Sequence, residues 1–115
     1  MSSSHDYQKD KRNNKIKIYI NGKFYLREKA KISVFDSSVM LGDGCWDSLR
    51  YHNKKFIFLN DHIKRLYKDA KLIDLKIHLK PKELITALNK TIAVNKMISD
   101  VHLRIIVSRG IKSTP

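Results

Sequence analysis

The chain has 115 residues and a mass of 13.5 kDa, and its 24 basic and 11 acidic side chains give a formal net charge of +13. This length predicts one domain or less, and a hydrophobic content of 42% is sufficient for a modest core and too high for a disordered chain. No apolar run approaches the ~20 residues that a membrane-spanning helix requires, and the polar N-terminus lacks the apolar segment of a secretory signal. The single cysteine, Cys45, cannot form an internal disulfide, which fits a reducing, cytoplasmic compartment.

The excess of positive charge, taken alone, favours a polyanionic partner such as nucleic acid. However, 18 of the basic residues are lysines and only 6 are arginines, and both base readout and bidentate phosphate binding favour arginine. The lysines are also scattered, apart from a basic cluster within residues 9–17. A solvated lysine-rich surface is therefore the preferred interpretation, with a nucleic-acid-binding module as an alternative.

The first 31 residues predict an arm followed by a hairpin. Residues 1–15 predict a disordered basic arm, because they are rich in Ser, Asp and Lys and show no periodicity. Isoleucines alternate with other residues over 16–20, which predicts a half-buried strand. Asn21-Gly22 is a strong hairpin signal because both residues tolerate a positive φ, and residues 24–27 predict the returning strand.

The middle of the chain predicts a loop and a second pair of strands. A short apolar stretch over residues 33–36 leads into a predicted loop over 37–44, which holds two of the four glycines. Residues 45–52 predict a strand, and after a turn at Asn53-Lys54, residues 55–59 predict its returning partner.

Two helices and a last strand are predicted in the remainder. Asn60 or Asp61 is expected to cap the first helix, and Pro81 suits the first turn of the second, which ends near Asn95. Residues 101–108 are rich in β-branched residues and predict the last strand. The order of elements predicts an α+β fold in which a mainly antiparallel sheet packs against two helices.

Three segments carry side chains suited to chemistry. The sequence Leu-Gly-Asp-Gly at residues 41–44 allows a tight turn, although a purely structural bend is the commoner meaning of such a motif. Arg65 precedes Leu66 on the apolar stripe of its helix, so its guanidinium should lie at the edge of the buried face and could bind a phosphate or carboxylate. Arg104 lies within an apolar strand, where burial is costly unless an anion pairs with it. A solvent-exposed arginine is the alternative at both positions.

A metal site is not expected, because the five histidines have no ligand-like spacing with one another or with Cys45. Cys45 itself lacks neighbouring charges that would lower the pKa of its thiol, so we expect it to act as a small core residue. The residues by themselves thus predict a basic α+β domain with two arginines placed to bind anions.

Several short motifs occur in a fixed order with natural gaps: Phe35-Asp36, Leu41-Gly42-Asp43-Gly44-Cys45-Trp46-Asp47, Leu49-Arg50-Tyr51, Leu59-Asn60-Asp61-His62, Arg65-Leu66 and Arg109-Gly110. Together they resemble the N-terminal domain of the class IV pyridoxal-phosphate-dependent aminotransferases. This group includes branched-chain and D-amino-acid aminotransferases and aminodeoxychorismate lyases. The resemblance covers residues 16–115, and it implies pyridoxal 5'-phosphate as cofactor, an amino donor and a 2-keto acid as substrates, and a homodimer.

The resemblance implies roles for individual residues in a substrate pocket. Trp46, Ser48 and Arg50 stand at positions that line the pocket in the branched-chain enzymes, which usually have a glycine in place of Ser48. His102 and Arg104 stand where those enzymes carry a Tyr-x-Arg pair near the substrate carboxylate. A branched-chain-like substrate is favoured over a D-amino acid, because Val39 stands where the D-amino-acid enzymes tend to have a tyrosine.

Arg65 lies in the motif His-x-x-Arg-Leu, in which the family's arginine holds the cofactor phosphate. The family's Schiff-base lysine lies beyond the Arg109-Gly110 strand, in a C-terminal domain that we do not find in this chain. The resemblance therefore implies that the full-length protein is an aminotransferase and that the isolated chain is an inactive part of it. An interaction-only domain that keeps the scaffold without the chemistry is a further alternative.

Overall fold

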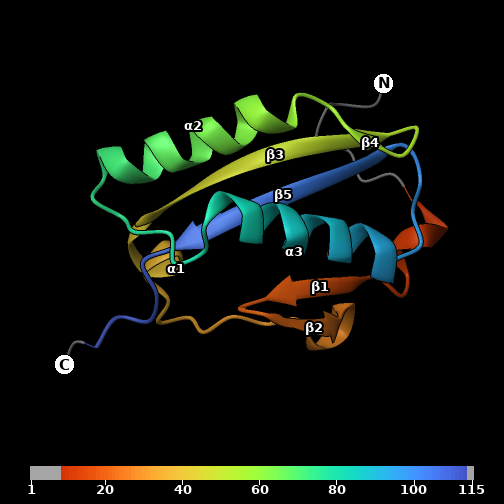
Figure 1. Cartoon of the computed structure of the whole chain (residues 1–115). Coiled ribbons are helices and arrows are strands. Elements are labelled where there is room, and N and C mark those ends of the chain that lie inside the picture. The colour runs from red at the N-terminus through yellow and green to blue at the C-terminus, as the bar shows by residue number, and fades with distance from the viewer. Residues whose placement is uncertain (1–8, 114–115) are drawn as a thin grey trace, which may run out of the picture. The chain divides into compact units, whose positions relative to one another are not determined.

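A computed structural model describes residues 9–113, and the chain forms two compact units, Met1–Lys31 and Ile32–Pro115 (Figure 1). In the first unit, β1 (Lys17–Ile20) and β2 (Lys23–Leu26) form an antiparallel hairpin. The turn residues Asn21 and Gly22 have φ angles of 49° and 91°, as the Asn-Gly signal predicts. The hairpin is therefore confirmed within one residue at each end.

The described part of the predicted basic arm contains a short helix. A 3-10 helix, Lys11–Asn13, is capped by the Asp10 carboxylate, which accepts a hydrogen bond from the Arg12 backbone at 2.9 Å. The same carboxylate forms an ion pair with the Arg12 guanidinium at 2.8 Å. The sequence predicts no regular structure here, because a single capped turn produces no hydrophobic period. Residues 1–8 of the arm lie outside the described residues. A second 3-10 helix, Arg27–Lys29, follows β2.

The second unit contains a three-stranded antiparallel sheet in the order β4-β3-β5. The central strand β3 (Gly44–His52) pairs with β5 (Val101–Ser108) over eight residues and with the much shorter β4 (Lys55–Phe56). The α+β fold and the antiparallel pairing are confirmed. The strands do not form the single sheet that the sequence predicts, because β1 and β2 make a separate two-stranded sheet.

Helices α2 (Leu59–Leu72) and α3 (Pro81–Val94) pack against one face of this sheet (Figure 1). Leu49 of β3 and Leu66 of α2 are fully buried at the centre of the contact. Among residues 9–113, the buried cluster at the centre of the core is aliphatic, with partly buried aromatic side chains packed against it. Its members come from both helices and both long strands: Leu49, Ile63, Leu66, Leu84, Leu88, Ile92, Leu103 and Ile105. In residues 9–113, no helix combines the length and apolar character needed to cross a membrane.

Three local predictions are wrong. A one-turn helix, α1 (Ser37–Leu41), replaces the predicted loop, because the Asp36 side chain caps its N-terminus and Gly42, at φ 66°, ends it. Helix α2 begins at Leu59, and Phe58 occupies the N-cap position with φ 52° and no side-chain cap. Asn60 and Asp61 consequently lie inside the first turn, and the predicted strand 55–59 is reduced to two residues.

Candidate functional site

Five of the six predicted site residues lie on the face of the sheet opposite the helices. Along β3, Asp47 and Leu49 are buried on the core side, and along β5 the same is true of Leu103 and Ile105. The intervening side chains therefore point to the other face, since successive residues of a strand alternate. This outward set, which we call the outer face, comprises Trp46, Ser48, Arg50, His102 and Arg104.

The register of the two strands brings the outer face together. Arg50 is the cross-strand partner of His102, and Ser48 is the partner of Arg104. Diagonally across the ladder, the Arg104 guanidinium carbon lies 4.8 Å from the centroid of the Trp46 ring, within the range of a cation–π contact. The Arg104 side chain is exposed, and none of the ion pairs found among residues 9–113 includes it.

Arg50 is held at one end of the outer face by an ion pair. Its Nη2 atom lies 3.2 Å from Asp100 Oδ1, and His52 Nδ1 lies 3.1 Å from the same oxygen. Both pairs are largely exposed, so each is expected to contribute about 0–1 kcal/mol to stability. Their effect on the site is to direct two basic side chains toward the end of β3.

Arg65 belongs to helix α2 and lies on the core side of β3, where it contacts Asp47 of that strand. Its Nε donates to Asp47 Oδ2 at 2.8 Å and its Nη2 donates to Asp47 Oδ1 at 2.7 Å, a bidentate pair. The Asp47 side chain is only 2% exposed, whereas the Arg65 side chain is 60% exposed. The guanidinium thus lies at the edge of the buried face, as predicted. The structure does not bring it onto the outer face, because Asp47 points to the opposite side of β3 from Trp46 and Ser48.

The Arg65 pairing holds the pKa of Asp47 down to about 2, and His62 adds a further hydrogen bond to the same carboxylate. Sequence reasoning missed Asp47. The signal available was its position two residues before Leu49, on the core side of an alternating strand, because a buried carboxylate requires a partner.

The Gly-Asp-Gly bend is held by Arg109. The Arg109 Nε donates to Asp43 Oδ2 at 2.7 Å, which lowers the pKa of that carboxyl, and the two Nη atoms donate to the carbonyls of Ile73 and Asp74 at the end of α2. Gly44 is required by a close approach, because a Cβ atom there would lie 2.5 Å from the Val107 carbonyl oxygen. The acid of this motif therefore binds a side chain, not the backbone N–H groups of its own turn.

A second small cluster anchors α1 to the end of β5. The Asp36 carboxylate accepts hydrogen bonds from the Ser108 hydroxyl, from the Ser38 hydroxyl and from the Ser38 backbone N–H at 2.9 Å, which together lower its pKa. The Ser37 hydroxyl donates to the Gly110 carbonyl at 2.6 Å. Together with the Arg109 contacts, these bonds fix the loop that leads into β3.

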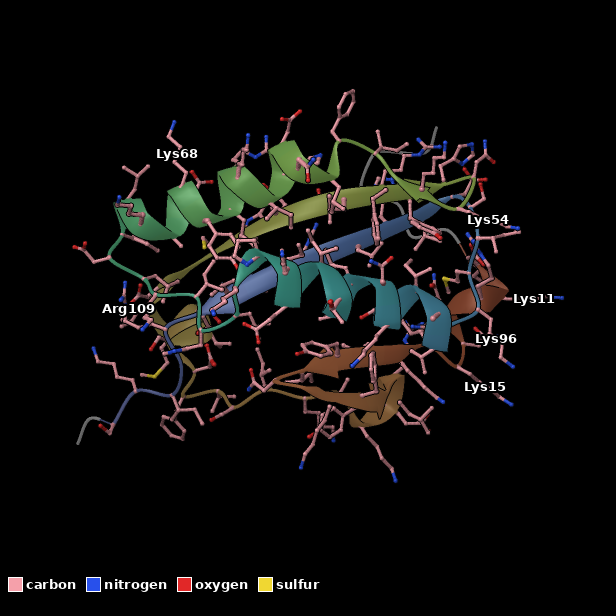
Figure 2. All side chains as sticks on the ribbon, viewed as in Figure 1. Lys11, Lys15, Lys54, Lys68, Lys96 and Arg109 are labelled. Carbon is pink, nitrogen blue, oxygen red and sulfur yellow. The ribbon has the colours of Figure 1, made fainter. Side chains whose placement is uncertain are left out.

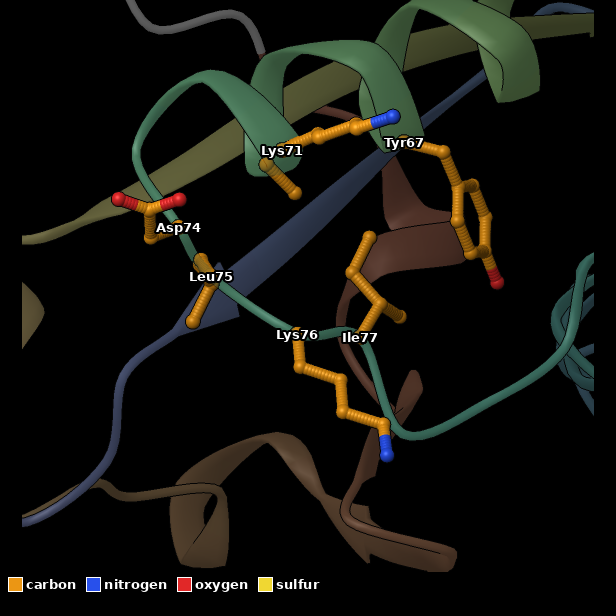
Figure 3. Close-up of a pocket in the computed structure, with 7 residues that line it drawn as sticks. Tyr67, Lys71, Asp74, Leu75, Lys76 and Ile77 are labelled. Atoms are coloured by element: carbon orange, nitrogen blue, oxygen red, sulfur yellow. The ribbon is translucent and has the colours of Figure 1, made fainter.

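An open hollow of about 480 Å³ lies at the C-terminal end of α2 and in the segment after it (Figure 3). Its lining residues are Tyr67, Ala70, Lys71, Asp74, Leu75, Lys76 and Ile77. None of the six predicted site residues lines it. Elsewhere in the second unit, Lys68 of α2 and the turn residues Lys54 and Lys96 point away from the ribbon (Figure 2), in keeping with a solvated lysine-rich surface.

Comparisons with known proteins give a consistent result. Residues 44–115 match the family model of amino-transferase class IV. The chain is 38% identical over 96 residues to a Methanocaldococcus jannaschii protein provisionally named a branched-chain-amino-acid aminotransferase, covering 84% of this chain and 33% of that protein. It is 35% identical over 99 residues to D-alanine aminotransferase from Listeria monocytogenes, covering 85% of this chain and 34% of that protein.

Solved structures show the same relationship. A T.th. branched-chain amino acid aminotransferase, complexed with N-(5'-phosphopyridoxyl)-L-glutamate, superposes with a TM-score of 0.77 at 28% identity, covering 88% of this chain and 35% of that one. The branched-chain aminotransferase of Thermoproteus uzoniensis with norvaline gives a TM-score of 0.73 at 29% identity, over 80% and 32% of the two chains. The chain spans about one third of the length of these relatives. The family model and the identities together show that the chain belongs to the class IV aminotransferases.

Proposed function

We propose that the full-length protein containing this chain is a pyridoxal-phosphate-dependent aminotransferase, which transfers an amino group between an amino acid or amine and a 2-keto acid. The observation that carries the proposal is the outer face, where the β3–β5 register gathers an arginine, an aromatic ring and further polar groups. The family relationship supports it, since proteins of similar sequence are named as branched-chain or D-alanine aminotransferases and a similar solved structure is a branched-chain enzyme.

Arg65 would hold the cofactor phosphate. The Arg65 guanidinium donates hydrogen bonds to Asp47 from Nε and from one N–H of Nη2. Among residues 9–113, its Nη1 atom has no hydrogen-bond partner. An exposed edge with two N–H groups suits a phosphate dianion, because arginine and phosphate form parallel hydrogen bonds. The residues present therefore fit the group. When bound, pyridoxal phosphate supplies the carbonyl that accepts the amino group and the electron sink that acidifies the substrate Cα–H.

The outer face would bind the substrate. Arg104 would orient a carboxylate with its exposed guanidinium, which stacking on Trp46 restrains. Ile106, the cross-strand partner of Trp46, is 64% exposed and adds apolar area suited to an aliphatic side chain, which favours a branched-chain-like substrate. Ser48, Arg50 and His102 would complete the polar side of the pocket.

The remaining parts of the enzyme follow from the same proposal. The Schiff-base lysine would come from the part of the full-length protein beyond residue 115, which fits a chain one third as long as its relatives. The working form would be a homodimer in the cytoplasm. This location fits a chain whose single cysteine cannot form an internal disulfide, because the cytoplasm is a reducing compartment.

The test uses the full-length protein and its Arg65→Ala variant. The absorption spectrum of the protein with pyridoxal phosphate should change on addition of a donor amine and recover on addition of a 2-keto acid. Replacing Arg65 with Ala should weaken cofactor affinity tenfold or more while the protein stays folded, because the lost charge-assisted hydrogen bonds are worth about 1.5–3 kcal/mol. Cofactor affinity that does not depend on Arg65 would reject its assigned role, and a spectrum insensitive to every amine would reject the activity.

A further inference from the structure

The Asp47 carboxylate is the acceptor for four hydrogen bonds. Its Oδ2 accepts from Arg65 Nε at 2.8 Å. Its Oδ1 accepts from Arg65 Nη2 at 2.7 Å, from the Ser48 backbone N–H at 2.8 Å and from His62 Nδ1 at 2.8 Å. A nearly buried carboxylate with this number of donors has one orientation available, because any rotation breaks several of the bonds.

The His62 ring contributes to this orientation as a donor. An ionised carboxylate can only accept, so the proton of the imidazole must reside on Nδ1. Arg65 Nη2 lies 3.2 Å from the same nitrogen. Two donors cannot bond to each other, and the short distance therefore reflects their common acceptor, Asp47 Oδ1. His62 and Arg65 are three residues apart on α2 and reach the carboxylate from the same side of the helix.

An unpaired exposed arginine samples many rotamers, and a ligand must restrict that freedom when it binds. Here the Nε and Nη2 atoms of Arg65 are fixed to Asp47, although the side chain is 60% exposed. The opposite edge, with Nη1, consequently keeps one direction relative to the sheet. The cost of ordering the side chain is met during folding and does not reduce ligand affinity.

We propose that Asp47, itself held by His62, is a positioning residue that presents the free edge of Arg65 to a phosphomonoester. The inference rests on the proposed function, in which Arg65 binds the cofactor phosphate. It makes a prediction opposite to that of simple charge counting. Removing the Asp47 charge makes the site more positive and would by itself strengthen phosphate binding, whereas loss of positioning weakens it.

The experiment measures affinity for pyridoxine 5'-phosphate by calorimetry on the full-length protein. This probe carries the phosphate but no aldehyde, so it cannot react with the 18 lysines of the chain. Asp47→Asn should weaken binding about fivefold or more, because the amide adds a donor facing the Arg65 donors. Asp10→Asn removes the same charge from another Asp–Arg pair, that with Arg12, and should change affinity less than twofold. Arg65→Lys should also weaken binding.

A second readout follows the guanidinium directly. The Nε–H proton of Arg65, identified by its loss in Arg65→Lys, should give a sharp NMR signal in the parent protein and a broad, rapidly exchanging one in Asp47→Asn. The variant His62→Ala keeps the Asp47–Arg65 ion pair and tests the positioning role if Asp47→Asn does not fold. It should broaden the same signal and weaken binding about twofold to threefold.

The outcomes separate the inference from the proposed function. Equal or tighter binding by folded Asp47→Asn, or an unaltered signal and affinity in His62→Ala, would overturn the positioning role while leaving Arg65 as a phosphate ligand. Binding that is unchanged in Arg65→Lys and Arg65→Ala would instead refute the phosphate role itself.

Discussion

Replacing Asp47 with Asn should make the stability of the folded chain less dependent on pH below about 5. The pKa of Asp47 is lowered from 3.8 to about 2 in the folded state, chiefly by the Arg65 hydrogen bonds. A carboxyl group whose pKa is lowered by folding contributes stability that is fully present at pH values above 3.8 and is lost as the pH falls through about 2. The shift corresponds to about 2 kcal/mol, and exposure of Arg65 to solvent reduces this to between about 1 and 2 kcal/mol.

The assay is urea unfolding of the parent chain and Asp47→Asn at a series of pH values from 6 to 2. Asn is the uncharged counterpart of a protonated Asp. The difference in free energy of unfolding between the two chains should therefore narrow by about 1–2 kcal/mol between pH 5 and pH 2. Asp36 and Asp43 also have lowered pKa values, but they are present in both chains and cancel in the difference. A difference that stays constant over this range would show that the Asp47–Arg65 pair does not stabilise the fold as reasoned.

Two further predictions concern the core and the outer face. Leu49→Ala should lower the free energy of unfolding by about 3–4 kcal/mol, because the side chain is fully buried between the sheet and the helices, whereas Leu72→Ala, at a site 74% exposed, should change it by less than about 0.5 kcal/mol. Similar losses for the two variants in urea unfolding would contradict the assigned core. Arg104→Ala in the full-length protein should raise the KM for the 2-keto acid about tenfold or more, since a charge-assisted hydrogen bond to the carboxylate is lost. It should leave affinity for the cofactor phosphate nearly unchanged, and equal losses in both would place Arg104 elsewhere in the mechanism.

The sequence determined the elements whose signals are local. The two long strands, β3 and β5, were predicted from the residues of each segment alone, since a preference for extended backbone does not depend on the strand's neighbours. The Asn21-Gly22 turn and Pro81 at the start of α3 were predicted for the same reason, because each depends on backbone preferences of one or two residues. The start of α2 was predicted at the wrong residue, because its N-cap is Phe58 in a left-handed conformation. A phenylalanine rarely adopts this conformation, so its residue type gives no signal for it.

The family could also be identified from the sequence, because its motifs are short and keep their order along the chain. Whether Arg65, Arg104 and the other four candidates act as the resemblance implies stays a prediction. What the structure adds is their arrangement: five share the outer face, and Arg65 meets the opposite side of β3 through Asp47.

Pairings between distant residues were decided by the tertiary structure alone. Asp47 pairs with Arg65, 18 residues later in the chain, and Asp43 pairs with Arg109, 66 residues later. No local pattern specifies which acidic side chain will pair with which basic one. The stacking of Arg104 on Trp46 likewise requires the β3–β5 register, which is set by the core that α2 and α3 bury. Periodicity along a chain assigns each side chain to a face, but only packing of one element on another brings two faces within bonding distance.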